Sequence, residues 1–134
     1  MNATLYTDGG ARGNPGPAGI GFMLTINGHE PILHGEYIGE TTNNQAEYKA
    51  LLAGLTRAHQ EGVTDIECFL DSELVVKQLR GEYRIKHADL KPRAAEVKEA
   101  AALFSSVRYS IVRREKNVEA DEMVNKAIDE HVGQ

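Results

Sequence analysis

The chain of 134 residues contains no tryptophan, only one cysteine, and no apolar run close to the roughly 20 residues that a membrane-spanning helix requires. The single cysteine, Cys68, excludes an internal disulfide and a cysteine-based zinc site. No charged segment followed by an apolar one opens the chain, so we expect no secretory signal and no membrane partner. These absences predict a cytoplasmic protein with one domain, residues 1–134, and nothing in the sequence requires more than a monomer.

The sequence also lacks an excess of positive charge, since 15 lysines and arginines against 20 aspartates and glutamates give a net charge of −5. A protein that binds nucleic acid mainly through charge is expected to be basic, so this sign alone argues against such a partner. Two bound divalent cations would add four positive charges and leave −1. Two segments, residues 80–93 and 108–116, are locally basic at +3 each, although most charged runs are only solvated faces.

Hydrophobic spacing and turn residues predict an element order of βββαβααβα. We expect strands at residues 2–7, 19–27, 30–38, 66–70 and 107–113, and helices at 44–60, from a cap at Asp71 or Ser72 to about Arg80, at 89–104 and at 118–131. Asn27-Gly28 between the second and third strands is a strong hairpin signal. The first three strands should form an antiparallel meander, and the last two, each reached across helices, should pair in parallel. The prediction is an α/β fold with a mixed five-stranded sheet and helices on its faces.

The segment YTDGGARGNPGPAG, residues 6–19, contains one acid, five glycines and two prolines. We expect the first strand to end here and a glycine loop to follow Asp8. Each glycine loses more backbone entropy on folding than other residues do, so a function should require either the loop or the acid. The glycines do not form a phosphate-binding P-loop, because the pattern G-x-x-x-x-G-K-[ST] is absent.

Two acids follow predicted strands, Asp8 after the first and Asp71 after the fourth. Ligands of open α/β sheets bind beyond the carboxyl ends of the strands, so neighbouring strands would bring both carboxylates to one edge of the sheet. Each residue also has an ordinary structural interpretation, an Asx turn for Asp8 and a helix N-cap for Asp71.

Two further acids lie in predicted helices. Glu47 shares an apolar or small face with Leu51 and Gly54, and a buried carboxylate is costly unless it is paired or bound to metal. An ion pair with Lys49 or with an arginine from elsewhere is the alternative. Asp121 lies one turn into the last helix, where the helix dipole by itself favours an acid.

Several carboxylates without matching cations nearby in the sequence favour hard divalent ions, Mg²⁺ or Mn²⁺, which prefer oxygen ligands. Two such ions roughly 3.5–4 Å apart suit phosphodiester hydrolysis, because one activates the attacking water and the other stabilises the leaving oxygen. The five histidines are scattered and form no competing pair at metal-ligand spacing.

Four segments, in this order, resemble the motifs of type 1 ribonuclease H. They are YTDGGARGNPGPAGIG, TTNNQAEYKALLAGL, FLDSELVV and RREKNVEADEMVNKA, and the resemblance covers nearly the whole chain. It implies a ribonuclease H-like fold, with the fourth and fifth strands parallel to the first. It also implies a metal-dependent endonuclease that cuts the RNA strand of RNA–DNA hybrids and leaves 5′-phosphate and 3′-hydroxyl ends, with cleavage of duplex RNA left open.

The resemblance implies that Asp8, Glu47, Asp71 and Asp121 hold two Mg²⁺ or Mn²⁺ ions. Asp8 would contact both ions, Asp121 the ion that activates water, and Glu47 and Asp71 the ion at the leaving O3′. Such enzymes read the minor groove through 2′-hydroxyls and backbone. The candidate substrate contacts are the amides of Gly9 and Gly10 and the side chains of Arg12, Asn14, Thr42, Asn43, Asn44, Gln45 and Ser72, with Arg12 and Thr42 directed at phosphates. Helix capping is the alternative for the two asparagines at 43 and 44.

The chain departs from the resemblance at two places. Many bacterial members carry a long basic, tryptophan-rich protrusion between the middle helices, whereas here only residues 81–88 join them, and the basic segment 80–93 is the candidate replacement. Many members also have a histidine in the loop before the last aspartate. Glu115 is the candidate for its catalytic role, and simple charge compensation of Arg113 and Arg114 is the alternative.

Two rival functions use the same fold. A catalytically silent nucleic-acid-binding module would be indicated by loss of one of the four acids, but all four are present. A different nuclease, such as a resolvase or an exonuclease, is disfavoured by the T-N-N element and by Asp71-Ser72, which suit the reading of 2′-hydroxyls and the groove.

Overall fold

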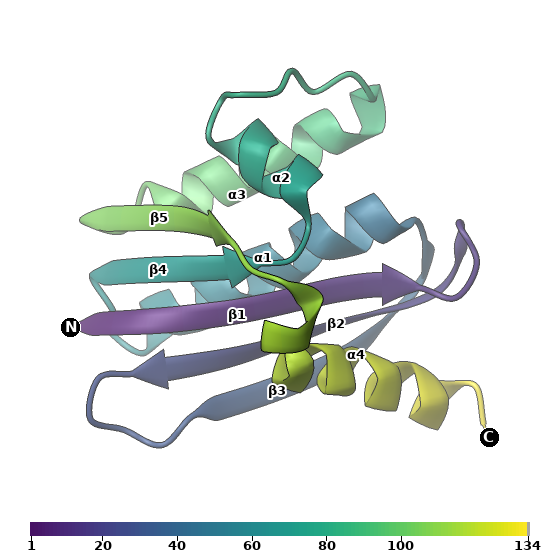
Figure 1. Cartoon of the computed structure of the whole chain (residues 1–134), viewed down its shortest axis with the longest axis horizontal. Coiled ribbons are helices and arrows are strands. Elements are labelled where there is room, and N and C mark those ends of the chain that lie inside the picture. The colour runs from purple at the N-terminus through teal and green to yellow at the C-terminus, as the bar shows by residue number, and fades with distance from the viewer. Residues whose placement is uncertain (134) are drawn as a thin grey trace.

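The structure, a computed structural model, describes residues 1–133 and contains a five-stranded sheet in the order β3-β2-β1-β4-β5. The strands are β1 (Asn2–Ala11), β2 (Gly16–Ile26), β3 (Ile32–Thr41), β4 (Asp65–Leu70) and β5 (Ser106–Ile111). The helices are α1 (Asn43–Gln60), α2 (Glu73–Leu79), α3 (Lys91–Ala101) and α4 (Val118–His131), with 3₁₀ turns η1 (Ala88–Leu90) and η2 (Arg114–Lys116). Figure 1 shows α1 and α3 behind the sheet and α4 in front of it. Strands β1 to β3 pair antiparallel and β1, β4 and β5 pair parallel, which confirms the predicted mixed sheet.

The first strand is longer than expected, and the prediction of a glycine loop after Asp8 is wrong. β1 continues through Gly9 and Gly10 to its end, and Asp8 pairs with Gly21 across the antiparallel ladder. Only residues 12–15 lie outside the two strands of this hairpin. The glycines therefore extend the ladder instead of ending it, and two of them, Gly9 and Gly21, are covered so closely by helix backbone that a side chain would not fit.

Both helices that flank the functional edge pack directly on glycine backbone. A Cβ atom on Gly9 would lie 2.2 Å from the Ala46 carbonyl oxygen of α1, and one on Gly21 would lie 2.5 Å from the Ala120 carbonyl oxygen of α4. Real Cβ atoms do not approach backbone atoms this closely, so any larger residue would push the helix away. The close packing therefore brings the N-terminal turns of α1 and α4 to opposite sides of β1, next to Asp8.

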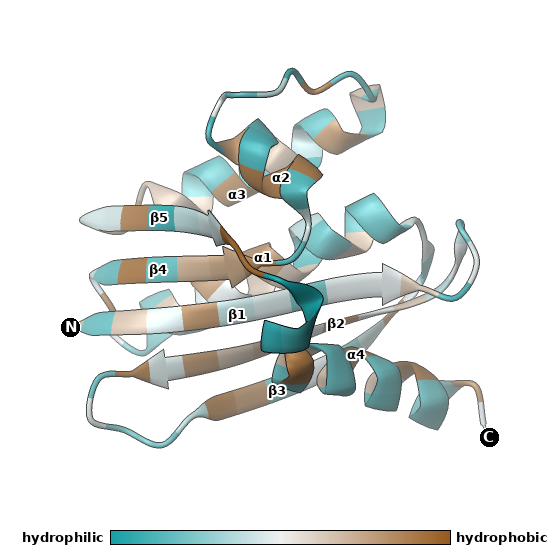
Figure 2. Ribbon diagram, in the orientation of Figure 1, coloured by the Kyte–Doolittle hydropathy of each residue, from teal (hydrophilic) through white to brown (hydrophobic). Residues whose placement is uncertain are grey.

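The main core lies between the sheet and the helices α1 and α3. Its fully buried side chains include Leu5, Leu24, Leu51, Leu55 and Val97. Burial of one such side chain contributes about 1.5–3 kcal/mol to stability. Figure 2 shows hydrophobic stretches on β3, β4 and β5 and a largely hydrophilic outer surface on α4. None of the helices in residues 1–133 is both long enough and apolar enough to cross a membrane.

The third predicted helix is shorter than expected. The sequence predicts residues 89–104, whereas the α-helix ends at Ala101 and a 3₁₀ turn precedes it. After Ala101 the chain tightens, and the Phe104 amide donates to the Ala101 carbonyl at 3.1 Å. This turn directs Phe104 into the core, where its ring meets that of His59 edge-on at 6.0 Å between centroids.

Candidate metal and nucleic-acid site

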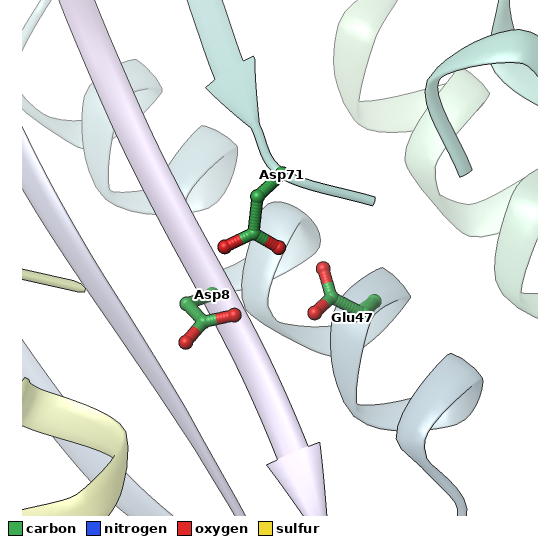
Figure 3. Close-up of side chains that lie close together, drawn as sticks. All are labelled: Asp8, Glu47 and Asp71. Atoms are coloured by element: carbon green, nitrogen blue, oxygen red, sulfur yellow. The ribbon is translucent and has the colours of Figure 1, made fainter. Parts of the chain in front are cut away.

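Three carboxylates converge where β1 passes the end of β4. Thr7 and Leu70 form the last pair between these strands, so Asp8 and Asp71 each lie one residue beyond it. Glu47 reaches the same point from the second turn of α1. Figure 3 shows the three side chains pointing toward one another, and one carboxylate oxygen from each lies within 4.8 Å of the others.

Helix capping decides which residues remain available at this edge. Thr42 is the N-cap of α1, and its hydroxyl oxygen accepts a hydrogen bond from the Gln45 amide at 3.2 Å. Ser72 is the N-cap of α2, and its hydroxyl oxygen accepts one from the Val75 amide at 3.3 Å. Because Ser72 rather than Asp71 caps the helix, the Asp71 carboxylate is left in the cleft.

Glu47 forms no ion pair with a cation in residues 1–133. It is 7% exposed, and its Oε1 accepts only a long hydrogen bond of 3.4 Å from the Gly9 amide. Its Oε2 is buried and has no hydrogen-bond partner among the described residues. No lysine or arginine in residues 1–133 pairs with it, so the ion pair that the sequence left open is not formed.

Asp121 faces the same cleft from the first turn of α4. Its carboxylate is near enough to Asp8 to raise the pKa of that residue. Asn125, one turn further along α4, donates from its Nδ2 to the Asp121 carbonyl and to the Asp121 carboxylate, at 3.1 and 3.3 Å. The fourth predicted acid is therefore held at the edge of the three-carboxylate cluster.

Burial and like charge make two members of this cluster, Asp8 and Glu47, resist ionisation. Desolvation first, and then the neighbouring Asp71 carboxylate, raise the pKa of Asp8 to about 7. The pKa of Glu47 is raised well above its ordinary value, again by burial first and then by Asp8. Positive charge placed between these oxygens would offset both effects, because a bound cation favours the ionised carboxylates.

The donor set fits Mg²⁺ or Mn²⁺. All of its donors are carboxylate oxygens, the hard ligands that these ions prefer. The buried and unpartnered Oε2 of Glu47 is an atom that needs such a partner, since an unpaired buried charge is costly.

The cleft around the acids is lined by six of the nine predicted substrate contacts. These are Gly9, Gly10, Arg12, Asn43, Asn44 and Ser72. The other three, Asn14, Thr42 and Gln45, lie outside its lining.

Several of the predicted contacts bind other parts of the protein. Asn14 Oδ1 accepts from the Asn43 amide at 2.9 Å, and Asn43 Oδ1 accepts from the Ala11 amide at 2.8 Å. Gln45 Nε2 donates to the carbonyl and carboxylate of Asp89, at 2.8 and 3.2 Å. These contacts tie the start of α1 to the β1–β2 hairpin on one side and to η1 on the other.

Arg12 is also engaged within the protein. Its guanidinium forms an ion pair with Asp129 of α4 and donates to Asn125 at 3.4 Å. A phosphate at Arg12 would therefore have to compete with α4 for the same guanidinium.

The loop before α4 places an arginine in the cleft, which the sequence did not single out. Arg114 lines the cleft with the acids, whereas Glu115 does not. The Glu115 side chain is 67% exposed and lies 4.0 Å from Arg113. Its surroundings match the charge compensation that the sequence left open. The sequence alone gave no signal of which of the two adjacent residues, Arg114 or Glu115, lines the cleft.

The basic segment 80–93 contributes to a second groove. Arg80 and Arg93 are engaged with the protein, Arg80 with the Tyr109 carbonyl at 2.9 Å and Arg93 with Glu96 at 2.9 Å. Arg84 and Lys91 instead line a groove between the loop after α2 and α3, together with Lys98. No acid lines this groove in the described part of the chain, so its charge is positive.

Comparison with known proteins agrees with the fold. A family model described as "Reverse transcriptase-like" matches residues 6–127. The crystal structure of RNase H1 from the archaeon Halobacterium salinarum is 39% identical, with a TM-score of 0.93, and the match covers 97% of this chain and 99% of that one. LC11-RNase H1 in complex with an RNA/DNA hybrid is 41% identical, with a TM-score of 0.92, and the match covers 98% and 99% of the two chains.

The chain therefore belongs to the reverse transcriptase-like class. Within that class it belongs to the type 1 ribonuclease H family. A bifunctional protein of Mycobacterium tuberculosis is 40% identical over 131 residues, which are 96% of this chain but 36% of that protein. The chain thus spans about a third of the length of that curated relative.

Proposed function

We propose that the chain is a metal-dependent endoribonuclease that hydrolyses the RNA strand of RNA–DNA hybrids and leaves 5′-phosphate and 3′-hydroxyl ends. The observation that carries the proposal is the convergence of Asp8, Glu47 and Asp71, with ligand atoms within 4.8 Å, in a cleft that Asp121 also lines. The RNA/DNA hybrid bound to LC11-RNase H1, a protein of the same fold and 41% identity, supports the substrate class.

The four acids would hold two Mg²⁺ or Mn²⁺ ions, which supply an activated water and charge stabilisation at the leaving oxygen when bound. The protein's own part is to hold these carboxylates close together, and bound cations would favour their ionised form. Asp8, between Glu47 on one side and Asp121 on the other, is the residue suited to contact both ions. Asn44, Ser72 and the Gly10 amide are the contacts for the sugar and backbone of the hybrid, since they line the cleft beside the acids.

Cleavage specificity separates this proposal from its alternatives. Labelled RNA–DNA hybrid, duplex RNA and duplex DNA are incubated with the protein and Mg²⁺ or Mn²⁺, with EDTA as the metal-free control. We expect metal-dependent cleavage of the RNA strand of the hybrid. Binding of the hybrid without cleavage would indicate a silent binding module, and equal cleavage of duplex RNA would indicate a nuclease of broader specificity.

We assign Arg114, in place of Glu115, to the cleft beside the ion that would activate water. A guanidinium there can donate two hydrogen bonds to a phosphate and offset charge that develops in the transition state. We expect Arg114→Ala to lower the rate of hybrid cleavage by about 100-fold, the loss typical of removing one such donor. Glu115→Ala, the matched control in the same turn, should change the rate by less than about threefold, because its exposed carboxylate touches only a neighbouring arginine.

The two variants are compared by initial rates at saturating Mg²⁺. A large loss for Glu115→Ala together with a small loss for Arg114→Ala would reverse this assignment.

Hybrid binding should depend strongly on salt, because the positive groove meets the phosphate backbone without a tryptophan-rich protrusion. Replacing Arg84 and Lys91 by alanine should weaken binding and lower the slope of log affinity against log salt by about 2, one for each phosphate that is no longer neutralised. Arg108→Ala is the control, because Arg108 is exposed at the far end of the sheet and pairs with Glu67. The measurement is fluorescence anisotropy with a labelled hybrid in Ca²⁺. An affinity that hardly changes with salt would contradict the proposal that the groove binds the phosphate backbone.

We further propose that residues 1–134 act as one catalytic domain, as a monomer in the cytoplasm. The buried and unpaired thiol of Cys68 supports a reducing compartment.

A further inference from the structure

Asn117 is completely buried although its neighbours on both sides, residues 115–116 and 118–119, are exposed. By position it is the N-cap of α4, but its side chain makes no capping hydrogen bond. An asparagine N-cap ordinarily accepts a hydrogen bond from one of the first helical amides. The side chain of Asn117 therefore has a different use.

Asn117 forms hydrogen bonds with two of the four acids, Asp71 and Asp121, and with Thr7, the residue before a third. Its Nδ2 donates to the carbonyl of Thr7, the residue before Asp8, at 2.8 Å and lies 3.4 Å from Asp71 Oδ2. Its own backbone carbonyl accepts from the Asp121 amide at 3.2 Å. A single residue thus connects strand β1, the end of β4 and the first turn of α4.

The energetics argue against a purely stabilising role. Asn117 Oδ1 is buried without a hydrogen-bond partner among the described residues, and so is the hydroxyl of Thr7 beside it in the fold. A buried amide with an unpaired oxygen costs free energy that an apolar side chain of similar size would avoid. Only the two donated bonds need an amide here, and both are directed at the strand ends that carry the acids.

We propose that Asn117 is a positioning residue whose side chain holds Asp8 and Asp71 in the arrangement that binds divalent cations. This rests on the proposed function in one respect, namely that these acids bind metal. Asn117 does not contact the ions or the substrate. It acts by fixing the directions of the carboxylates, in the way that residues behind metal ligands generally do.

The test measures Mn²⁺ affinity of the full chain without nucleic acid, by isothermal titration calorimetry and by the electron paramagnetic resonance signal of free Mn²⁺. We expect Asn117→Ala to weaken Mn²⁺ binding by about 10- to 100-fold, the usual cost of removing a group behind metal ligands. The Mg²⁺ concentration for half-maximal cleavage should rise in parallel, while KM for the hybrid stays the same.

Tyr48→Phe is the matched control, because it removes another buried hydrogen bond, from the Tyr48 hydroxyl to Gln78 at 2.6 Å. It should lower the melting temperature but leave Mn²⁺ affinity unchanged. If Asn117→Ala lowers only the melting temperature, as Tyr48→Phe does, Asn117 is a structural residue and the proposal is overturned. If Asn117→Ala does not fold, Asn117→Ser, which keeps a small donor, is measured against the same criterion.

The outcomes also separate this inference from the proposed function. If the wild-type protein binds Mn²⁺ but cuts no hybrid, the proposed function is overturned. The Mn²⁺ affinities of the wild type and of Asn117→Ala would still decide the role of Asn117. Normal cleavage with unchanged Mn²⁺ affinity in Asn117→Ala would remove this inference alone. A wild-type protein that binds no Mn²⁺ would overturn both.

Discussion

Replacement of Asp8 by asparagine should abolish hybrid cleavage and at the same time make the metal-free protein more stable at neutral pH. The loss of activity follows because Asp8 is the carboxylate placed between the other acids, and we expect a fall of at least about 10³-fold, comparable to the loss of a group that acts directly at the reaction centre. The gain in stability follows because the variant removes a buried carboxylate whose ionised form is disfavoured by burial and by the nearby Asp71 carboxylate. Residues that are required for activity commonly lower the stability of the folded protein.

The pH dependence of this gain can be worked out from the raised pKa. The pKa of Asp8 is about 7 in the folded protein against 3.8 for an ordinary aspartate, so the folded state binds the proton more tightly than the unfolded state. Stability of the metal-free protein should therefore fall as the pH rises from about 4 to about 7 and level off above that range. The advantage of Asp8→Asn should be absent near pH 4 and reach about 2–4 kcal/mol near pH 8.

The measurement is urea unfolding of both proteins in EDTA at pH 4 and pH 8, repeated with Mg²⁺. Mg²⁺ should stabilise the wild type at pH 8 and have little effect on the variant, because binding to the folded state raises stability by mass action. Asp65→Asn is the control acid. The hydrogen bond from Thr64, and then that from Ser106, lower the pKa of Asp65, so this variant should lose stability at neutral pH and keep its cleavage activity. A variant at Asp8 that is less stable than the wild type at pH 8 would contradict the account of the cluster.

Replacement of Gly9 by alanine should destabilise the protein by about 3 kcal/mol or more, the upper range for overpacking of a closely packed site. The added Cβ would lie 2.2 Å from the Ala46 carbonyl oxygen and 2.6 Å from the Glu47 amide nitrogen. Both are backbone atoms, so α1 itself would have to move. The sequence alone suggests instead that this glycine lets the backbone approach the nucleic acid, with substitution harming binding more than folding.

Gly10→Ala provides the matched control one residue along the same strand. A Cβ there would be 3.9 Å from Asn43 Oδ1 and 4.0 Å from Val124, which is ordinary van der Waals contact. Alanine also restricts the unfolded chain more than glycine does, so the variant should be as stable as the wild type or slightly more stable. Thermal melts of the two variants are compared. Equal melting temperatures would mean that α1 yields to the extra atom.

The element order could be predicted because local signals agreed along the chain. Hydrophobic spacing, the Asn27-Gly28 turn and the caps before α1 and α2 all pointed to the same strands and helices. Parallel pairing of the later strands followed from the helices between them. Asp8 and Asp71 were expected to lie together only if the first and fourth strands are neighbours, and the sheet order places them side by side. The sequence by itself therefore determined the sheet, and it singled out the three acids that the fold brings together, Asp8, Glu47 and Asp71.

Tertiary packing decided the rest, because it depends on distances between segments far apart in the chain. The glycines of β1 and β2 pointed to a loop when read locally, but helices packed on their backbone keep them in a strand. Glu115 and Arg114 are adjacent and both charged, and only the path of the turn before α4 places the arginine in the cleft. The sequence analysis assigned no role to Asn117. Its link between Thr7 and Asp71 exists only because the folded chain brings these two residues, which are 110 and 46 positions away along the chain, to its side chain.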